Sequence, residues 1–86
     1  MQANRNFNIL IVDDDAEIAH YIKTELCDWY RFDHARNGKE GLKMLLTGKY
    51  DLVISDVMMP EMDGITMLKN IKSNSNISDI PVILLT

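Results

Sequence analysis

Short runs of apolar residues alternate along the chain with segments in which apolar residues recur every three or four positions. Three of the runs, residues 7–12, 51–55 and 80–85, are compact, rich in β-branched residues and followed by a polar residue. A fourth run, residues 32–35, is weaker because two polar residues interrupt it. Continuous apolar runs of this length are typical of strands buried on both faces of a parallel sheet. We therefore predict three buried strands, and an edge strand at residues 32–35.

The segments between these runs have the periodicity of amphipathic helices. Their apolar stripes are Ile18, Tyr21, Ile22 and Leu26, then Leu42, Leu45 and Leu46, and finally Ile65, Leu68 and Ile71. Residues able to cap a helix precede each stripe: Asp14 or Asp15, then Asn37 with Glu40 as in a capping box, then Asp63. Strict alternation of strand and helix predicts an α/β fold with right-handed crossovers.

The composition fits one small folded domain. The chain has 86 residues and a mass of 9.9 kDa, and 47% of its residues are hydrophobic while 26% are charged. Its one cysteine, Cys27, cannot form an internal disulfide, and the pattern of apolar residues leads us to expect neither a signal peptide nor a membrane-spanning stretch. We expect a cytoplasmic protein that is not bound to a membrane. The net charge of −4 argues against direct nucleic-acid binding.

Candidate chemistry gathers where the predicted strands end. Asp13 and Asp14 follow the first strand, Asp56 follows the third, and Thr86 follows the fourth. In open α/β sheets, ligands bind beyond the carboxyl ends of the strands, so these side chains are expected at one edge. A single aspartate at such a place is more often a helix cap. Two strand ends with aspartate, one of them doubled, favour a site for a hard divalent cation, and Mg²⁺ fits best.

Two segments resemble the receiver domain of bacterial two-component response regulators. They are Ile-Leu-Ile-Val-Asp-Asp-Asp at residues 9–15 and Asp-Leu-Val-Ile-Ser-Asp-Val-Met-Met-Pro-Glu-Met-Asp-Gly at residues 51–64. Residues 81–86, Pro-Val-Ile-Leu-Leu-Thr, are similar to the fourth strand of that family. The resemblance implies a flavodoxin-like doubly wound parallel sheet with strand order 2-1-3-4. It also implies a phosphoacceptor that receives a phosphoryl group from a sensor histidine kinase or a phosphotransfer protein and switches conformation to control an output.

The resemblance assigns a role to each candidate residue. Asp56 is similar to the phosphoacceptor, and Asp13 and Asp14 match the acidic pair that holds Mg²⁺, Asp14 directly and Asp13 through water. The other matched positions are Met58, whose backbone carbonyl would be a further metal ligand, Pro60 and Gly64, which shape the loop, and Thr86, the switch hydroxyl. Two further expectations do not come from the resemblance: the side chains of Met58, Met59 and Met62 pack, and His20 and His34 are solvated away from the site.

The resemblance runs from about Phe7 to the last residue, and we interpret residues 1–86 as the N-terminal portion of a receiver domain, about two thirds of one. The family continues through a helix, a strand carrying a lysine that contacts the phosphoryl group, and a last helix, and none of the lysines here matches that lysine. We therefore expect this chain by itself to be phosphorylated poorly. With one helix on one face of the sheet, apolar side chains of strands 3 and 4 should remain exposed. A homodimer through strand 4 is the expected consequence.

Two other functions remain open from the residues. A phosphohydrolase of the haloacid-dehalogenase type also uses a strand-end aspartate and Mg²⁺, and needs a second acid two positions later. The residue two positions after Asp13 is an acid, Asp15, whereas the residue two positions after Asp56 is Met58, which is not an acid. The other possibility is an interaction module without chemistry. The receiver interpretation predicts a regulator and no enzyme beyond slow self-dephosphorylation.

Overall fold

The computed structural model describes residues 7–85. Along this range the elements are β1 (Asn8–Val12), α1 (Ala16–Leu26), β2 (Arg31–Ala35), α2 (Gly38–Thr47), β3 (Leu52–Asp56), α3 (Gly64–Ser73) and β4 (Val82–Leu85). Every predicted strand and helix is present. Strand β4 begins at Val82, later than the apolar run suggests, because Pro81 has no N–H to donate to the ladder.

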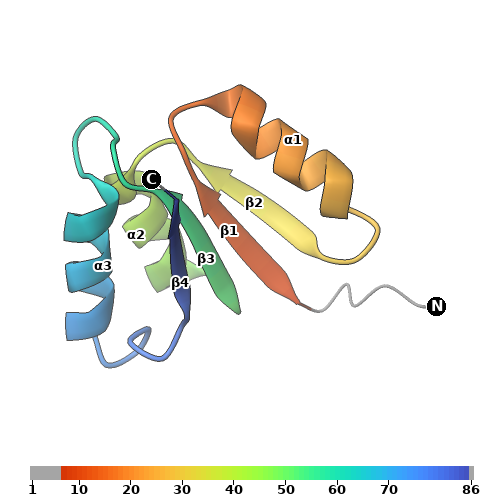
Figure 1. Ribbon diagram of the computed structural model, residues 1–86. Coiled ribbons are helices and arrows are strands. Elements are labelled where there is room, and N and C mark those ends of the chain that lie inside the picture. The colour runs from red at the N-terminus through yellow and green to blue at the C-terminus, as the bar shows by residue number, and fades with distance from the viewer. Residues whose placement is uncertain (1–6, 86) are drawn as a thin grey trace.

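The strands form one parallel sheet in the order β2-β1-β3-β4, as predicted. Helix α1 lies on one face, and α2 and α3 lie on the other (Figure 1). This is the flavodoxin-like, doubly wound arrangement. Because the strands run in the same direction, their carboxyl ends lie at a single edge of the sheet. The residues that follow β1 and β3 are brought side by side there, since these two strands are neighbours.

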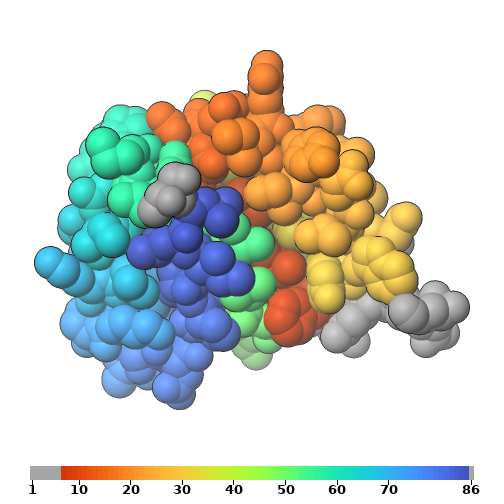
Figure 2. Space-filling view, viewed as in Figure 1, coloured from red at the N-terminus to blue at the C-terminus, as the bar shows by residue number. Residues whose placement is uncertain are grey.

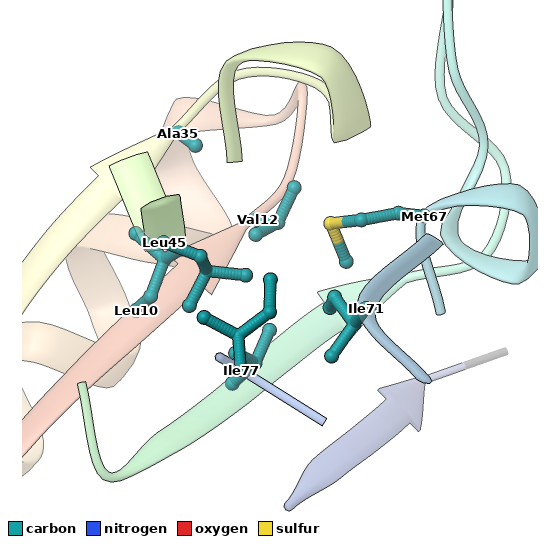
Figure 3. Packing of buried hydrophobic residues seen from close by; sticks show 8 residues of the cluster. Leu10, Val12, Ala35, Leu45, Met67, Ile71 and Ile77 are labelled. Atoms are coloured by element: carbon teal, nitrogen blue, oxygen red, sulfur yellow. The ribbon is translucent and has the colours of Figure 1, made fainter. Parts of the chain in front are cut away.

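The larger hydrophobic core lies between the sheet and helices α2 and α3 (Figure 3). It consists of Leu10, Val12, Ala35, Leu45, Val53, Met67, Ile71 and Ile77. Leu45 and Ile71 belong to the predicted stripes. Met67 is fully buried although it lies outside the predicted stripe of α3, and its flexible side chain extends toward Val12.

The predicted stripe of α1 is partly wrong. Ile18 is 45% exposed and Tyr21 is 66% exposed, whereas the small side chain of Ala19 is buried against the sheet. A small residue at the contact lets the helix lie close to the strands and turns the larger side chains beside it toward solvent. In the other two helices, Leu46 and Ile65, at the margins of their predicted stripes, are also exposed.

The predicted caps are present at all three helices of residues 7–85. Each cap side chain accepts a hydrogen bond from a backbone N–H in the first turn: Asp15 from Glu17 at 2.9 Å, Asn37 from Glu40 at 2.8 Å, and Asp63 from Thr66 at 2.7 Å. Of the two residues proposed to cap α1, Asp15 is the cap. Asp14 is therefore free to take part in the cluster described below.

On the α1 side of the sheet the face of β4 is open, as predicted, whereas Leu52 and Ile54 of β3 are half-buried against the core cluster beneath α1, contrary to the prediction. Helix α1 packs over β1 and β2 and does not extend across β4 (Figure 1). Ile83, which pairs with Ile54 in the ladder, is 48% exposed, and Leu85 is 40% exposed. In the space-filling view, β4 lies at the surface with no helix above it (Figure 2). None of the helices formed by residues 7–85 has the length and apolar character needed to cross a bilayer.

Candidate functional site

Three aspartates meet at the carboxyl edge of the sheet. Asp13 and Asp14 directly follow β1, and Asp56 is the last residue of β3. Because β1 and β3 are paired, one carboxylate oxygen from each of the three residues lies within 4.8 Å of the others. Asp13 is only 4% exposed, Asp56 is half-buried and Asp14 is exposed. The structure thus brings together the three carboxylates that the sequence places at strand ends.

Burial and repulsion make the charge on Asp13 unfavourable. Burial raises the pKa of the Asp13 carboxyl above its ordinary value, and the nearby charges of Asp56, Asp14 and Asp15 raise it further. The backbone N–H of Asp15, which donates to Oδ1 of Asp13 at 2.7 Å, acts in the opposite direction. A bound cation would relieve both the desolvation and the repulsion.

The donor set fits a hard divalent cation. All the side-chain donors in the cluster are carboxylate oxygens, which Mg²⁺ prefers over softer ligands. Every lysine of residues 7–85 lies in a helix or in the loop between α2 and β3, and none of them is at the end of a strand. One exposed aspartate and one buried aspartate leave room for water in the coordination shell, which suits Mg²⁺.

The loop after β3 is closed tightly over Asp56. The Gly64 N–H donates to the carbonyl of Val57 at 2.9 Å. A Cβ atom at Gly64 would collide with the carbonyl oxygen of Asp56, so only glycine allows this approach. The first residue of α3 therefore packs directly against the backbone of Asp56.

The same loop contains a feature that the sequence did not reveal. Glu61 has a φ of 66°, a left-handed conformation that is uncommon for a residue other than glycine. It lies in a tight turn in which the Met62 N–H donates to the Pro60 carbonyl at 2.8 Å. The carbonyl of Met62 in turn accepts from the Gly38 N–H at 3.0 Å. Pro60 thus shapes the loop as part of a turn that is anchored to the first residue of α2.

The methionines of this loop differ in their packing. Met59 and Met62 contact the larger core, as expected. Met58 does not pack, because its side chain is 78% exposed. An exposed side chain is compatible with a role that needs only the backbone carbonyl at this position. Thr86, the proposed switch residue, lies outside the residues that the structure describes.

The expectation that His34 is solvated and remote from the site is wrong. Its Nε2 lies 2.7 Å from the backbone carbonyl oxygen of Asp13, and the side chain is half-buried. His34 occupies the penultimate position of β2, opposite Ile11 of β1. From there its ring extends beyond the end of the ladder to the first aspartate. The other histidine, His20, is exposed on α1.

Asp15 does not belong to the cluster. Its Oδ1 is occupied by the cap of α1, and the carboxylates that meet at the strand ends are those of the other three aspartates. The spacing of Asp13 and Asp15 that kept a haloacid-dehalogenase mechanism open therefore reflects a helix cap.

Comparisons with known proteins agree with this geometry. The sequence matches the response regulator receiver domain over residues 9–86. It is 38% identical to chemotaxis protein CheY-3 of Vibrio cholerae over 96% of this chain and 65% of that protein. It is 42% identical to a probable cyclic di-GMP phosphodiesterase of Vibrio cholerae, over 91% of this chain and 18% of that protein. The solved receiver domain of a signal transduction histidine kinase from Syntrophus aciditrophicus superposes with a TM-score of 0.89 at 43% identity, over 93% of this chain and 61% of that one.

The fold, the acidic cluster and these matches define the class of protein. The chain belongs to the response regulator receiver domain family, the phosphoacceptor signalling modules of two-component systems. Members of this class are signalling proteins rather than enzymes, although one relative is named as a phosphodiesterase. Nothing in the comparisons supports a haloacid-dehalogenase function. The chain spans less than two thirds of the length of each of these relatives.

Proposed function

We propose that Asp56 is the residue that accepts the phosphoryl group. The observation that carries this assignment is the convergence of Asp56 with the acidic pair after β1, within 4.8 Å. Asp56 is the member of the cluster that is half-buried at the end of a central strand, so it is held firmly but remains open to a donor. The proposed donor is a phosphohistidine on a sensor histidine kinase or a phosphotransfer protein.

The hydrogen bonds of Asp56 indicate which oxygen reacts. Oδ1 accepts a hydrogen bond from the Val57 N–H at 2.8 Å, so Oδ2 is the oxygen left for bond formation. In the transfer, Oδ2 forms a bond to phosphorus while the phosphorus–nitrogen bond of the donor breaks, and the imidazole leaves with the electron pair. Little covalent assistance is needed for this step, so positioning and charge neutralisation dominate. Thr86 is proposed to donate a hydrogen bond to the new phosphoryl oxygens.

The proposed cofactor is Mg²⁺, held by Asp13, Asp14, Asp56 and the backbone carbonyl of Met58. When bound, Mg²⁺ would supply the positive charge that lets an anionic phosphoryl group approach an anionic carboxylate. The chain's own residues supply the rest: Gly64 fixes the backbone of Asp56, and the Asp15 N–H fixes the carboxylate of Asp13. The raised pKa of Asp13 supports the proposal, because the unbound cluster carries unfavourable charge.

Treatment with phosphoramidate tests this assignment. In the presence of Mg²⁺, intact-mass spectrometry should show the gain of a single phosphoryl group, and removal of the metal with a chelator should abolish the gain. Asp56→Asn should block the modification, whereas Asp28→Asn, which makes the same change in charge in an exposed turn, should not. We expect the reaction of this chain alone to be slow, since no lysine of residues 7–85 lies at a strand end to assist it. Equal modification of the Asp56→Asn variant would disprove the assignment.

The wider role is a proposal of the same kind. The protein would act in the cytoplasm as the receiver of a phosphorelay and control an output through a conformational switch. Its only enzymatic property would be slow self-dephosphorylation, and this domain would not itself contact nucleic acid, in keeping with the net charge of −4.

We also propose that the 86-residue chain, when alone in solution, forms a homodimer through β4. The support is the combination of exposed Ile83 and Leu85 with an edge of β4, the last strand in the sheet order, that no strand of residues 7–85 pairs with. Sedimentation velocity over a range of concentrations should show a dimer that Ile83→Lys weakens. Ile65→Lys is the matched control, because Ile65 is similarly exposed but lies on α3. A chain that is monomeric at every concentration would contradict this proposal.

A further inference from the structure

His34 lies where β2 meets the acidic site. The residue is on the edge strand, on the same face of the sheet as α1, because it pairs with Ile11, whose side chain packs with Ile9 and Ala19 in the core cluster beneath α1. Its ring forms part of the wall of a groove of about 390 Å³ between α1 and β2, which Ala19, His20 and Phe32 also line. The groove keeps one side of the imidazole accessible, while Nε2 points toward the end of β1.

The direction of the hydrogen bond between His34 and Asp13 is fixed by chemistry. A backbone carbonyl can only accept, so at a separation of 2.7 Å the Nε2 of His34 must carry the hydrogen. This requirement excludes the neutral ring with its proton on Nδ1. It is met equally by the neutral ring with its proton on Nε2 and by the charged ring, and so it does not depend on the charge of His34.

This hydrogen bond continues the pairing of β1 and β2 by one residue. The backbone ladder ends with the Asp13 N–H, which donates to the Ala35 carbonyl at 3.0 Å. Beyond Ala35 the chain leaves the sheet to cap α2 with Asn37, so β2 does not continue alongside Asp13. The side chain of His34 takes the place of the missing backbone donor. The N–H, the carbonyl and the carboxylate of Asp13 are then all hydrogen-bonded.

We infer that His34 is a positioning residue for the acidic cluster, acting through the peptide group that joins Asp13 to Asp14. Because a peptide group is planar, a hydrogen bond that holds the Asp13 carbonyl also sets the direction in which Asp14 leaves β1. The carboxylates of the cluster repel one another, and without this constraint the exposed Asp14 would turn away into solvent. His34 therefore preorganises the two metal-binding aspartates without contacting the metal. This inference rests on the metal site proposed above.

Three substitutions separate positioning from simple packing. His34→Phe keeps a ring of similar size but removes the donor. His34→Gln restores a donor, because the glutamine amide nitrogen reaches about as far from the backbone as Nε2 of histidine. His34→Asn also carries an amide donor, but its nitrogen reaches only as far as Nδ1 and so should not restore the hydrogen bond. His20→Phe changes the same groove without touching Asp13 and serves as the matched control. Circular dichroism and thermal unfolding establish that each variant is folded.

The first readout needs no metal. Long-range ¹⁵N–¹H correlation spectra of the wild-type chain should show that Nε2 of His34 carries a proton, and a neutral ring protonated only at Nδ1 would overturn the inference. The second metal-free readout is the Asp15 amide, which donates to the Asp13 carboxylate. Its hydrogen exchange should accelerate in His34→Phe and return toward the wild-type rate in His34→Gln. Unchanged exchange in a folded His34→Phe variant would also overturn the inference.

The last readout is Mg²⁺ titration followed by amide chemical shifts. The loss of one hydrogen bond should weaken Mg²⁺ binding by about two- to tenfold in His34→Phe. The affinity should recover in His34→Gln but not in His34→Asn, and it should be unchanged in His20→Phe. A folded His34→Phe variant with wild-type affinity would contradict the inference. If the wild-type chain itself binds no Mg²⁺, the proposed metal site fails, and the ring protonation and the Asp15 exchange decide on His34 independently.

Discussion

Replacing Asp13 with asparagine should stabilise the protein when no metal is bound. The substitution removes a charge that is almost completely buried and that faces the carboxylates of Asp14 and Asp56. It keeps the size of the side chain and retains an Oδ1 atom that can accept the Asp15 N–H. The variant therefore isolates the electrostatic penalty of the cluster from its packing.

The expected gain follows from the separation of the charges. At the 4.8 Å limit between the carboxylate oxygens, two unit charges repel by about 0.9 kcal/mol in a water-like dielectric and by about 3.5 kcal/mol at an effective dielectric constant of about 20. Replacing a charge-assisted hydrogen bond to Asp15 by a neutral one opposes this gain by about 1 kcal/mol. We expect a net stabilisation of about 1–2 kcal/mol, where each 1 kcal/mol raises the melting temperature of a domain of this size by about 4–8 °C.

The dependence on pH has a defined sign. Because burial raises the pKa of Asp13 in the folded protein, its contribution to stability is greatest below the ordinary carboxyl pKa and is lost as the pH rises through the raised folded value. Urea unfolding of the wild type at a series of pH values should show this loss. Asp13→Asn should not show it, and the difference between the two proteins should be largest at neutral pH.

Magnesium should reverse the order of stability. A ligand at one hundred times its dissociation constant stabilises the folded state by about 2.7 kcal/mol, which exceeds the advantage of about 1–2 kcal/mol expected for Asp13→Asn without metal, and Asp13→Asn should forfeit most of this gain. Asp28→Asn controls for the change in net charge, because Asp28 is exposed in the turn after α1. An Asp13→Asn variant that is destabilised in metal-free buffer, or that behaves like Asp28→Asn with and without Mg²⁺, would contradict the proposed electrostatic penalty.

Two further substitutions test contacts around the site and the core. Gly64→Ala should destabilise the protein by about 1–3 kcal/mol, because its Cβ meets the Asp56 carbonyl; a change below about 0.5 kcal/mol in urea unfolding would show that the loop relaxes freely. Tyr50→Phe should cost about 1 kcal/mol, since the Tyr50 hydroxyl donates to Asp33 at 2.7 Å. Burial and that hydrogen bond raise the pKa of Tyr50 to about 12, so wild-type stability should fall from about pH 10 upward as unfolded tyrosine ionises. Spectrophotometric titration should show the late-ionising tyrosine disappear in the variant, and its persistence would contradict the assignment.

The strands and the helix caps were predictable because their signals are local. A buried parallel strand needs only a short apolar run, and a cap needs only a polar side chain at the correct offset from the first turn. The acidic cluster was predictable for a topological reason, since the ends of neighbouring parallel strands must meet. The sequence pattern did not predict which side chain of α1 contacts the sheet, because periodicity alone cannot determine that Ala19, rather than the larger Ile18, faces the strands.

The remaining features depend on tertiary geometry. No residue type marks the positive φ of Glu61, since glycine and asparagine are the usual signals for that conformation. The contact between His34 and Asp13 joins residues 21 positions apart. It follows from the register of β1 against β2, which the hydrophobic pattern of a weak edge strand does not specify.

The most direct test of the central assignment is to locate the phosphoryl group chemically. After treatment with phosphoramidate and Mg²⁺, borohydride reduction converts a phosphorylated aspartate to homoserine, which peptide mass spectrometry can locate. Trypsin separates the candidates, because Asp56 lies in the peptide 50–69 and Asp13 and Asp14 lie in the peptide 6–23. Phosphorylation of Asp56 predicts homoserine at position 56 and unmodified aspartate at positions 13 and 14. Homoserine at position 13 or 14, with aspartate retained at position 56, would contradict the assignment.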